Sequence, residues 1–310
     1  MKKSYSFMTT LLVSLAVAFS ACEKEPKYIV QVRANDGGII DGQSGYYAEG
    51  ETIVFQAIPN DGYFFAGWSD GNTDNPREIT VGSDNFYLGA SFATTVDLGL
   101  TSGTLWATHN LGAYTPGDDG NYYAWGETAI KTDYNWDNYK YGSDYHALTK
   151  YCNLADYGKS GFTDNLTSLE DSDNAVIANI GNDWTMPSAT DFQELYDQCY
   201  WKFTEKYYYN NYRGWGFIVY KSVDKSKDRQ NHKESEHNYS PETDIHIFLP
   251  VTGYYSNSKK LGIGSAYYWT TSLNTERPNN AQSFDTYKSL VLNMGESRYV
   301  GMPIRPIRRK

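Results

Sequence analysis

The chain has little cysteine, an excess of acidic over basic residues and only a short apolar run near its N-terminus. Three cysteines in 310 residues are too few for a disulfide-framework protein. Asp and Glu number 37 against 27 Lys and Arg, which gives a formal net charge of −10. Nucleic-acid phosphates need a basic face, so this balance argues against a nucleic-acid partner. The apolar run, residues 11–19, is shorter than the roughly 20 residues that a membrane-spanning helix needs.

The sequence also lacks the motifs of common catalytic sites. It contains no nucleophile elbow, no phosphate-binding loop and no paired-histidine motif. In the charged run of residues 221–242, a zinc site at His232 and His237 competes with a solvated loop, and their spacing favours the loop. His109 and His246 lie in strand-like stretches and are expected to be structural. We therefore expect no catalytic residue, no metal site and no cofactor.

Tyrosine, in contrast, is abundant. The chain has 29 Tyr against 13 Phe, and a disordered protein would lack these aromatics. Because tyrosine can be half wet, the surplus indicates surfaces as well as core. One tyrosine- and asparagine-rich segment falls between a predicted helix and a predicted strand, where a loop is expected. Its composition is typical of adaptable binding surfaces, although a β-hairpin that packs its tyrosines on the domain is the alternative. The candidate ligand-binding residues are Tyr207, Tyr208, Tyr209 and Tyr212.

Residues 1–21 have the features of a bacterial signal peptide. Two lysines supply positive charge, residues 11–19 form the apolar stretch, and small residues precede Cys22. Residues 19–22, Phe-Ser-Ala-Cys, resemble a lipobox, which implies cleavage before Cys22 and lipidation of that cysteine. The alternative is ordinary secretion with an unmodified cysteine near the new N-terminus.

Residues 22–27 would then form a short lipidated tether. Several acyl chains on one residue satisfy the two-signal requirement for stable membrane anchoring. The Glu-Lys-Glu that follows Cys22 is similar to the export tag of surface lipoproteins from Gram-negative gut anaerobes. These resemblances imply an outer-membrane lipoprotein that faces the cell exterior, with the bilayer as the partner of its lipid anchor.

Residues 28–93 alternate apolar and polar side chains in short runs separated by turn residues. Val30 and Val32 mark one half-buried strand, and Ile53 and Phe55 mark another. This spacing predicts a small all-β domain. Its motifs resemble a divergent internalin-type B-repeat, usually an extracellular spacer: Gly37-Gly38, Tyr47-x-x-Gly50-Glu51, Ala57-x-Pro59, Asp61-Gly62-Tyr63-x-Phe65-x-Gly67-Trp68, Asn75-Pro76 and Ala90-x-Phe92.

Residues 96–310 carry a second set of motifs along their whole length: Leu105-Trp106-Ala107, Asn110-Leu111-Gly112-Ala113, Tyr123-Ala124-Trp125-Gly126, Trp184-Thr185-Met186-Pro187, Ile247-Phe248-Leu249-Pro250, Tyr267-Tyr268-Trp269 and Ile304-Arg305-Pro306-Ile307. These motifs resemble the Fibrobacter succinogenes major paralogous domain. The resemblance implies a C-type-lectin-like fold with few helices and many short strands. The predicted fold class is therefore α+β: a small all-β module followed by a larger, lectin-like α+β domain.

The clearest helix signal begins at Ser188, directly after a Met-Pro pair that forces extended backbone. Ser188 is expected to be the N-cap, and Asp191 to close a capping box. Phe192 and Leu195 begin an apolar face at helical period, which needs a sheet to lie on. The available partners are strands near residues 217–220, 245–251 and 267–271. A second helix is expected at about residues 173–180.

Cys152 and Cys199 are the two thiols of the mature fold, and export makes a disulfide between them a candidate. The alternative is two buried, small hydrophobic side chains. Formylglycine-generating enzymes share this general fold but use a reactive cysteine pair near the C-terminal end, and this chain has no cysteine after Cys199. The Glu-Pro-Asn motif of sugar-binding C-type lectins is absent too, and Arg277-Pro278-Asn279 is the nearest sequence.

Together these features favour a surface-anchored lipoprotein with a recognition or adhesion role, which binds a glycan or a cell-surface protein. An acidic domain without a metal site would have to bind sugars through aromatic stacking and asparagine hydrogen bonds. Two alternatives stay open. One is an enzyme with a degenerate formylglycine-generating-like site, and the other is a structural component of a surface assembly.

Overall fold

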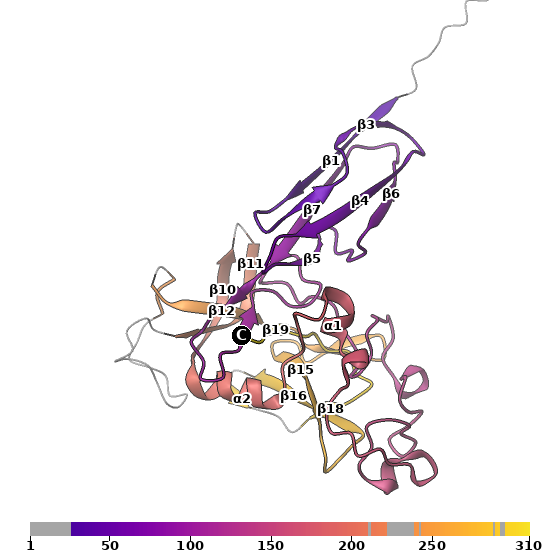
Figure 1. The fold of residues 1–310 in the computed structure, drawn as a ribbon, viewed down its shortest axis with the longest axis vertical. Coiled ribbons are helices and arrows are strands. Elements are labelled where there is room, and N and C mark those ends of the chain that lie inside the picture. The colour runs from indigo at the N-terminus through magenta and orange to yellow at the C-terminus, as the bar shows by residue number, and fades with distance from the viewer. Residues whose placement is uncertain (1–25, 210–211, 222–238, 242, 288, 292–294) are drawn as a thin grey trace, which may run out of the picture.

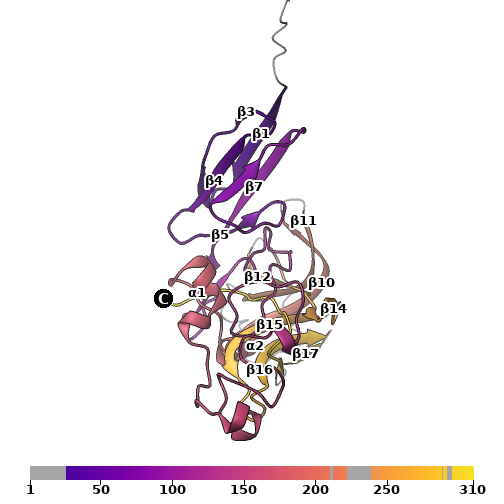
Figure 2. The ribbon, with the colours of Figure 1, turned by 90° about the vertical axis from the view of Figure 1, so that its right-hand side faces the viewer.

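The chain folds into a narrow β module and a larger domain that combines strands with short helices (Figure 1). The computed structural model describes residues 26–209, 212–221, 239–241, 243–287, 289–291 and 295–310. The two parts stay end to end when the molecule is turned by a quarter turn (Figure 2). Within the described residues, no helix is both long enough and apolar enough to cross a membrane.

Two sheets form the β module, with the strand orders β3-β1-β7-β5 and β2-β4-β6. In β4 the predicted alternation is confirmed, because Phe55 and Ala57 are buried while Val54 and Gln56 face solvent. Phe55 packs with Trp68 in a core to which both sheets contribute. The strands are β1 (Lys27–Ala34), β2 (Gly38–Asp41), β3 (Gly45–Ala48), β4 (Thr52–Pro59), β5 (Phe64–Trp68), β6 (Arg77–Thr80) and β7 (Phe86–Ala93).

The first and last strands of the module lie side by side and run in the same direction. β1 pairs with β7 from Val30 opposite Phe86 to Ala34 opposite Ala90. β1 starts at the end of the module that is far from the larger domain, and β7 leads into that domain (Figure 1). The chain therefore passes through the module from one end to the other.

The larger domain contains several small sheets, of which the main ones have the orders β10-β11-β12, β15-β16-β17 and β19-β9-β8. α1 starts two residues later than predicted because Asp171–Asp173 forms a 3-10 turn. The elements are β8 (Thr95–Val96), β9 (Leu105–Ala107), α1 (Ala175–Ile180), α2 (Ala189–Gln198), β10 (Tyr200–Tyr209), β11 (Tyr212–Lys221), β12 (Ile245–Pro250), β13 (Tyr254–Ser256), β14 (Lys259–Leu261), β15 (Ala266–Leu273), β16 (Asn280–Tyr287), β17 (Ser289–Val291), β18 (Glu296–Ser297) and β19 (Ile307–Arg308).

The predicted capping box at the start of α2 is confirmed. Ser188 Oγ accepts a hydrogen bond from the backbone N–H of Asp191 at 3.2 Å, and the Asp191 carboxylate accepts one from the Ser188 N–H at 2.7 Å. On the buried face, the Phe192 ring stacks on Phe284 of β16, with centroids 4.6 Å apart. It also packs against Tyr268 of β15, so α2 lies on the strand predicted near residues 267–271.

The two parts of the molecule meet at a packed joint. Phe64 of β5 lies edge-to-face against Trp184, with centroids 4.7 Å apart, inside a buried cluster that both parts share. The chain between the parts is also fixed, because the Thr94 N–H donates to Thr108 Oγ1 at 3.2 Å and the Thr108 N–H donates to the Thr94 carbonyl at 2.8 Å. Only Thr94 separates β7 from β8, so the connection between the two parts is short. The short connection and the packed rings together hold the module against the domain.

Candidate functional site

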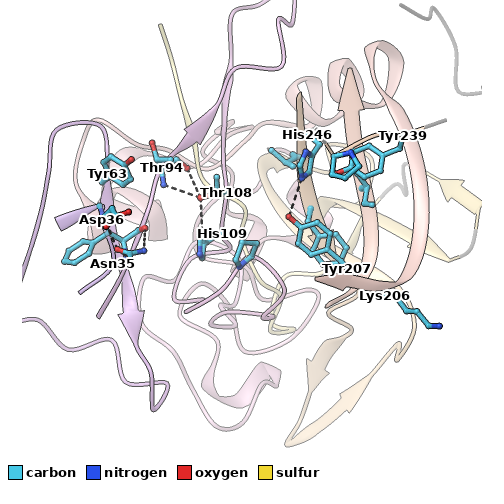
Figure 3. Close-up of a pocket in the computed structure, with 17 residues that line it drawn as sticks. Asn35, Asp36, Tyr63, Thr94, Thr108, His109, Lys206, Tyr207, Tyr239 and His246 are labelled. Atoms are coloured by element: carbon cyan, nitrogen blue, oxygen red, sulfur yellow. Dashed lines mark hydrogen bonds between the residues drawn. The ribbon is translucent and has the colours of Figure 1, made fainter. Parts of the chain in front are cut away.

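A cleft of about 720 Å³ lies beside this joint, with one wall from the β module and the other from the larger domain (Figure 3). The module side carries polar and aromatic groups, and the domain side carries an aromatic cluster with two histidines. The lining residues are Asn35, Asp36, Gly37, Tyr63, Phe92, Thr94, Thr108, His109, Pro116, Lys206, Tyr207, Ile218, Tyr239, Pro241, His246, Ile247 and Phe248.

The module wall is a tight turn held by Asn35. Its amide oxygen accepts hydrogen bonds from the N–H groups of Phe92 at 3.1 Å and Gly37 at 3.3 Å, and its amide nitrogen donates to the Phe92 carbonyl at 3.0 Å. A Cβ at Gly37 would lie 2.5 Å from the Tyr63 ring and 2.6 Å from Phe92. Glycine is therefore required for the turn to approach Tyr63 this closely.

The domain wall is built on a ring stack. Tyr207 of β10 lies face to face on Phe248 of β12, with centroids 4.0 Å apart and planes 2° apart. The Tyr207 hydroxyl is 3.4 Å from Nε2 of His246. The His246 ring in turn lies edge-to-face against Tyr239, at 5.2 Å between centroids. Figure 3 shows His246, Tyr207 and Tyr239 together on this side of the cleft, with Lys206 at the rim.

A buried arginine holds this wall in place from behind. Arg305 is fully buried, and its guanidinium donates to the carbonyls of Phe248 at 2.7 Å and Ala107 at 2.9 Å and to the Asn110 side chain at 2.8 Å. These bonds tie β12 to β9 and so fix the position of Phe248 beneath Tyr207. A buried cation without such partners would be costly, which makes Arg305 a positioning residue for the stack.

At the base of the cleft, the His109 ring is uncharged at neutral pH. Burial, together with the positive charge of Arg305, lowers the pKa of His109 to about 3. Its Nδ1 lies 2.7 Å from Thr108 Oγ1, the hydroxyl that also links to Thr94 at the joint. The charged side chains of the lining, Asp36 and Lys206, come from opposite walls. The cleft thus combines apolar ring faces with a neutral imidazole and one charged side chain on each wall.

The structure places the four predicted tyrosines in a β-hairpin and not in a loop. Tyr207, Tyr208 and Tyr209 belong to β10 and Tyr212 to β11, with Tyr208 opposite Arg213 and Tyr209 opposite Tyr212. The loop expectation was therefore wrong, because tyrosine also favours pleated strands. Tyr207 lies in the cleft, whereas the side chains of the other three lie outside what the structure describes.

The predicted disulfide is not formed. Cys152 and Cys199 are two separate buried thiols. Cys199, the C-cap residue of α2, packs in a hydrophobic core, while the Cys152 thiol lies 3.1 Å from the Leu154 carbonyl. A disulfide needs Cα atoms within about 7 Å and suitably directed Cβ vectors, and export alone predicts neither. This result matches the alternative of two buried small side chains.

Three further predictions concern residues outside the described part of the chain. These are the signal peptide and the lipidation site at Cys22, and the solvated loop around His232 and His237. Among the residues that the structure describes, no group of three or more histidine, cysteine or acidic side chains could hold a metal ion.

Sequence reasoning missed most of the cleft. Tyr63 belongs to one of the B-repeat motifs but was not predicted to line a site, and His246 was expected to be structural. Asn35 and Tyr239 gave no signal of their own. These four residues come from distant parts of the sequence, and only the fold brings them together around the cleft.

Comparison with known families identifies the module. Residues 28–95 match the family described as the divergent InlB B-repeat domain, which confirms the resemblance predicted from the motifs. The match begins at the second residue of β1 and ends at the first residue of β8. No curated protein and no solved structure matches this chain.

Proposed function

We propose that this protein is a surface-anchored recognition protein whose cleft between the B-repeat module and the larger domain binds a glycan. The anchor is a lipid on Cys22, and the protein faces the cell exterior from the outer membrane. The larger domain, residues 96–310, is a major paralogous domain with a C-type-lectin-like fold. Its motifs and its β-rich structure with two short α-helices in the described residues support this assignment.

The observation that carries the proposal is the pair of aromatic walls. Sugars offer apolar C–H faces edged by hydroxyls, and tyrosine rings offer an apolar face with a polar tip. Tyr63 stands on one wall and Tyr207 on the other, with the His246 ring and the Asp36 carboxylate as hydrogen-bonding groups. The volume of about 720 Å³ falls within the range of small-molecule sites, roughly 300–1,000 Å³.

The shape of the cleft favours a glycan over a folded protein. A protein partner typically covers about 800 Å² of each surface, most of it on broad faces and not in a concave hollow. A few sugar rings, in contrast, can enter between the two walls. Because Phe64 and Trp184 fix the walls relative to each other, the cleft is formed before the ligand arrives. Such preorganisation lowers the cost of binding.

The joint also changes the role of the B-repeat module. A spacer would only set the distance between the membrane and the larger domain. This module, in contrast, supplies Asn35, Gly37 and Tyr63 to the lining of the cleft. We infer that the module is part of the binding unit. A binding screen must therefore use a chain that carries both parts, because residues 96–310 alone lack one wall.

The test is a glycan-array screen of the chain from residue 23 onward, followed by titration of any ligand found. Tyr207→Ala should weaken binding about tenfold, the equivalent of about 1.4 kcal/mol. Tyr87→Ala is the matched control, because Tyr87 is 62% exposed on the module and does not line the cleft. Equal affinities for the two variants, or no glycan bound at all, would contradict the proposal. Turnover of a bound compound would favour the enzyme alternative, and copurification with one stoichiometric partner would favour the structural one.

The anchor has its own test. Cys22→Ala should leave the chain unlipidated and released from membranes, since the proposed acyl chains have no other attachment site. Fractionation of cells with a high-salt wash measures this directly. A variant that still sediments with membranes would show that the protein is held there by something other than a lipid on Cys22.

A further inference from the structure

A second hollow, of about 350 Å³, lies entirely within the larger domain. No residue of the β module lines this second hollow, and it shares no lining residue with the cleft. Three tyrosine rings form its apolar part, and an exposed isoleucine stands among the polar groups around it. The lining residues are Gly120, Asn121, Tyr122, Ile130, Lys131, Thr132, Tyr134 and Tyr255.

The three rings are locked by contacts within the protein. Tyr122 and Tyr255 meet edge-to-face, with centroids 4.8 Å apart and planes at 85°. The Tyr134 hydroxyl donates to the Tyr122 carbonyl at 2.6 Å. The Tyr255 N–H donates to the Gly301 carbonyl at 2.8 Å, and a Cβ on Gly301 would lie 2.7 Å from the Tyr134 ring. The hollow therefore has a rigid aromatic floor that a ligand does not need to order.

The charges beside the hollow are already paired. Lys131 Nζ lies 2.8 Å from the Glu127 carboxylate and donates to the backbone and side-chain oxygens of Asn138 at 3.0 and 3.1 Å. The three N–H groups of Lys131 are thus used within the protein. Lys260 Nζ lies 5.6 Å from the centre of the Tyr122 ring and pairs with Asp119. An anionic or cationic ligand would have to break one of these pairs, so the hollow suits a neutral ligand.

We propose that this hollow is a second carbohydrate subsite, which takes one neutral sugar ring. The ring would lie with its C–H face toward Tyr122 and Tyr255, and its hydroxyls would reach the Thr132 hydroxyl and the Asn121 amide. The volume is at the small end of ligand sites, about 300–1,000 Å³, and therefore fits a single ring better than a chain. This subsite goes beyond the proposed function of the cleft and does not require it.

The test uses two substitutions at the rim that should not disturb the fold. Ile130 is 56% exposed, and Thr132 is also exposed. Thr132→Trp would fill the hollow, and Ile130→Asp would place an unpaired charge beside it. Ile263→Asp is the matched control, because Ile263 is 75% exposed and lines neither the cleft nor the second hollow. Thermal melting of each variant checks that it is folded.

Binding is measured by saturation-transfer difference NMR on the chain from residue 23 onward, in a Tyr207→Ala background that weakens the cleft. The probes are the methyl glycosides of glucose, galactose, mannose and N-acetylglucosamine, with p-cresol as a probe for an aromatic side chain. We expect at least one glycoside to give a signal whose titration yields a Kd, and we expect Thr132→Trp and Ile130→Asp to raise that Kd about tenfold, equivalent to about 1.4 kcal/mol. Ile263→Asp should leave the Kd unchanged.

Three outcomes would overturn the subsite: no glycoside signal, a signal that both rim variants leave intact, or binding of p-cresol in preference to every glycoside. The last would show that the hollow receives an aromatic side chain of a protein partner. Failure of the cleft proposal is separate, since it would appear as unchanged binding to the array when Tyr207 alone is replaced.

Discussion

The rings of Tyr207 and Phe248 lie 4.0 Å apart and parallel within 2°. One face of Tyr207 is thus committed to the protein, while the residue also lines the cleft. The stack connects the two explanations for the tyrosine-rich segment, because the same ring contributes to packing in a hairpin and to a binding surface. Stability and ligand binding can be separated at this residue.

Tyr207→Ala should lower the free energy of unfolding by about 2 kcal/mol, because the aromatic pair contributes roughly 0.5–1.5 kcal/mol and the half-buried ring area adds about 1 kcal/mol. Tyr207→Phe keeps the stack and should be nearly neutral in stability. Denaturant unfolding of the three proteins measures the difference. A loss of several kcal/mol, as for an emptied core site, would mean that the ring is essentially structural.

Gly37→Ala should destabilise the module and disturb the cleft together. The added Cβ meets Tyr63 at 2.5 Å and Phe92 at 2.6 Å, and overpacking of this kind costs about 1–3 kcal/mol. Gly82→Ala is the control, because its Cβ would meet nothing within 4 Å. Thermal melting should separate the two variants. Equal melting temperatures would show that the turn moves away from Tyr63 at little cost.

Acid should weaken the larger domain through Asp173. Burial alone would raise the pKa of this carboxylate, but hydrogen bonds from Lys150, Tyr141 and Tyr151 lower it from 3.8 to about 2. A depressed folded-state pKa contributes stability above pH 3.8 that is lost as the pH falls toward 2. The contribution is on the order of 2 kcal/mol.

Asp173→Asn removes this titration. The variant should be less stable than the natural chain at neutral pH, and the difference should shrink as the pH falls from 4 to 2. Denaturant unfolding across this range measures both curves. If the two curves stay parallel, the acid sensitivity of the protein arises from other carboxylates.

The two cysteines of the fold should react as buried thiols. Cys152 and Cys199 are both buried, and burial raises the pKa of Cys152, which disfavours the reactive thiolate. A thiol reagent should label both residues in denaturant without a reductant and label neither in the native protein. Labelling that requires a reductant would mean that the two cysteines form a disulfide.

Local sequence patterns were sufficient to predict those elements whose conformation is determined by residues close in the sequence. The cap at Ser188 and Asp191 was predictable because four consecutive residues contain the whole motif. The alternation around Phe55 was predictable because a strand with one buried face repeats every second residue. The B-repeat motifs were found in the same way, since their turns need glycine and asparagine at fixed offsets.

The cleft could not be predicted because its walls meet only through the tertiary fold. Asn35 and Tyr63 line the same cleft as His246 because Phe64 of the module packs against Trp184 of the larger domain. No spacing in the sequence encodes the contact between Phe64 and Trp184. The disulfide prediction failed for a related reason. It rested on the chemistry of the compartment, whereas bond formation depends on where the fold places two side chains.

The parallel pairing of β1 with β7 has a mechanical consequence. Under the proposed anchoring, a ligand that pulls on the larger domain is resisted at the lipid, so tension enters the module at Lys27 and leaves at Ala93. Because these two strands are parallel neighbours, a force applied at these two ends loads them in shear. The backbone hydrogen bonds between β1 and β7 must then break together. A hairpin pulled at its open end would instead lose its bonds one at a time. Under that anchoring, the module is oriented to withstand traction along its long axis.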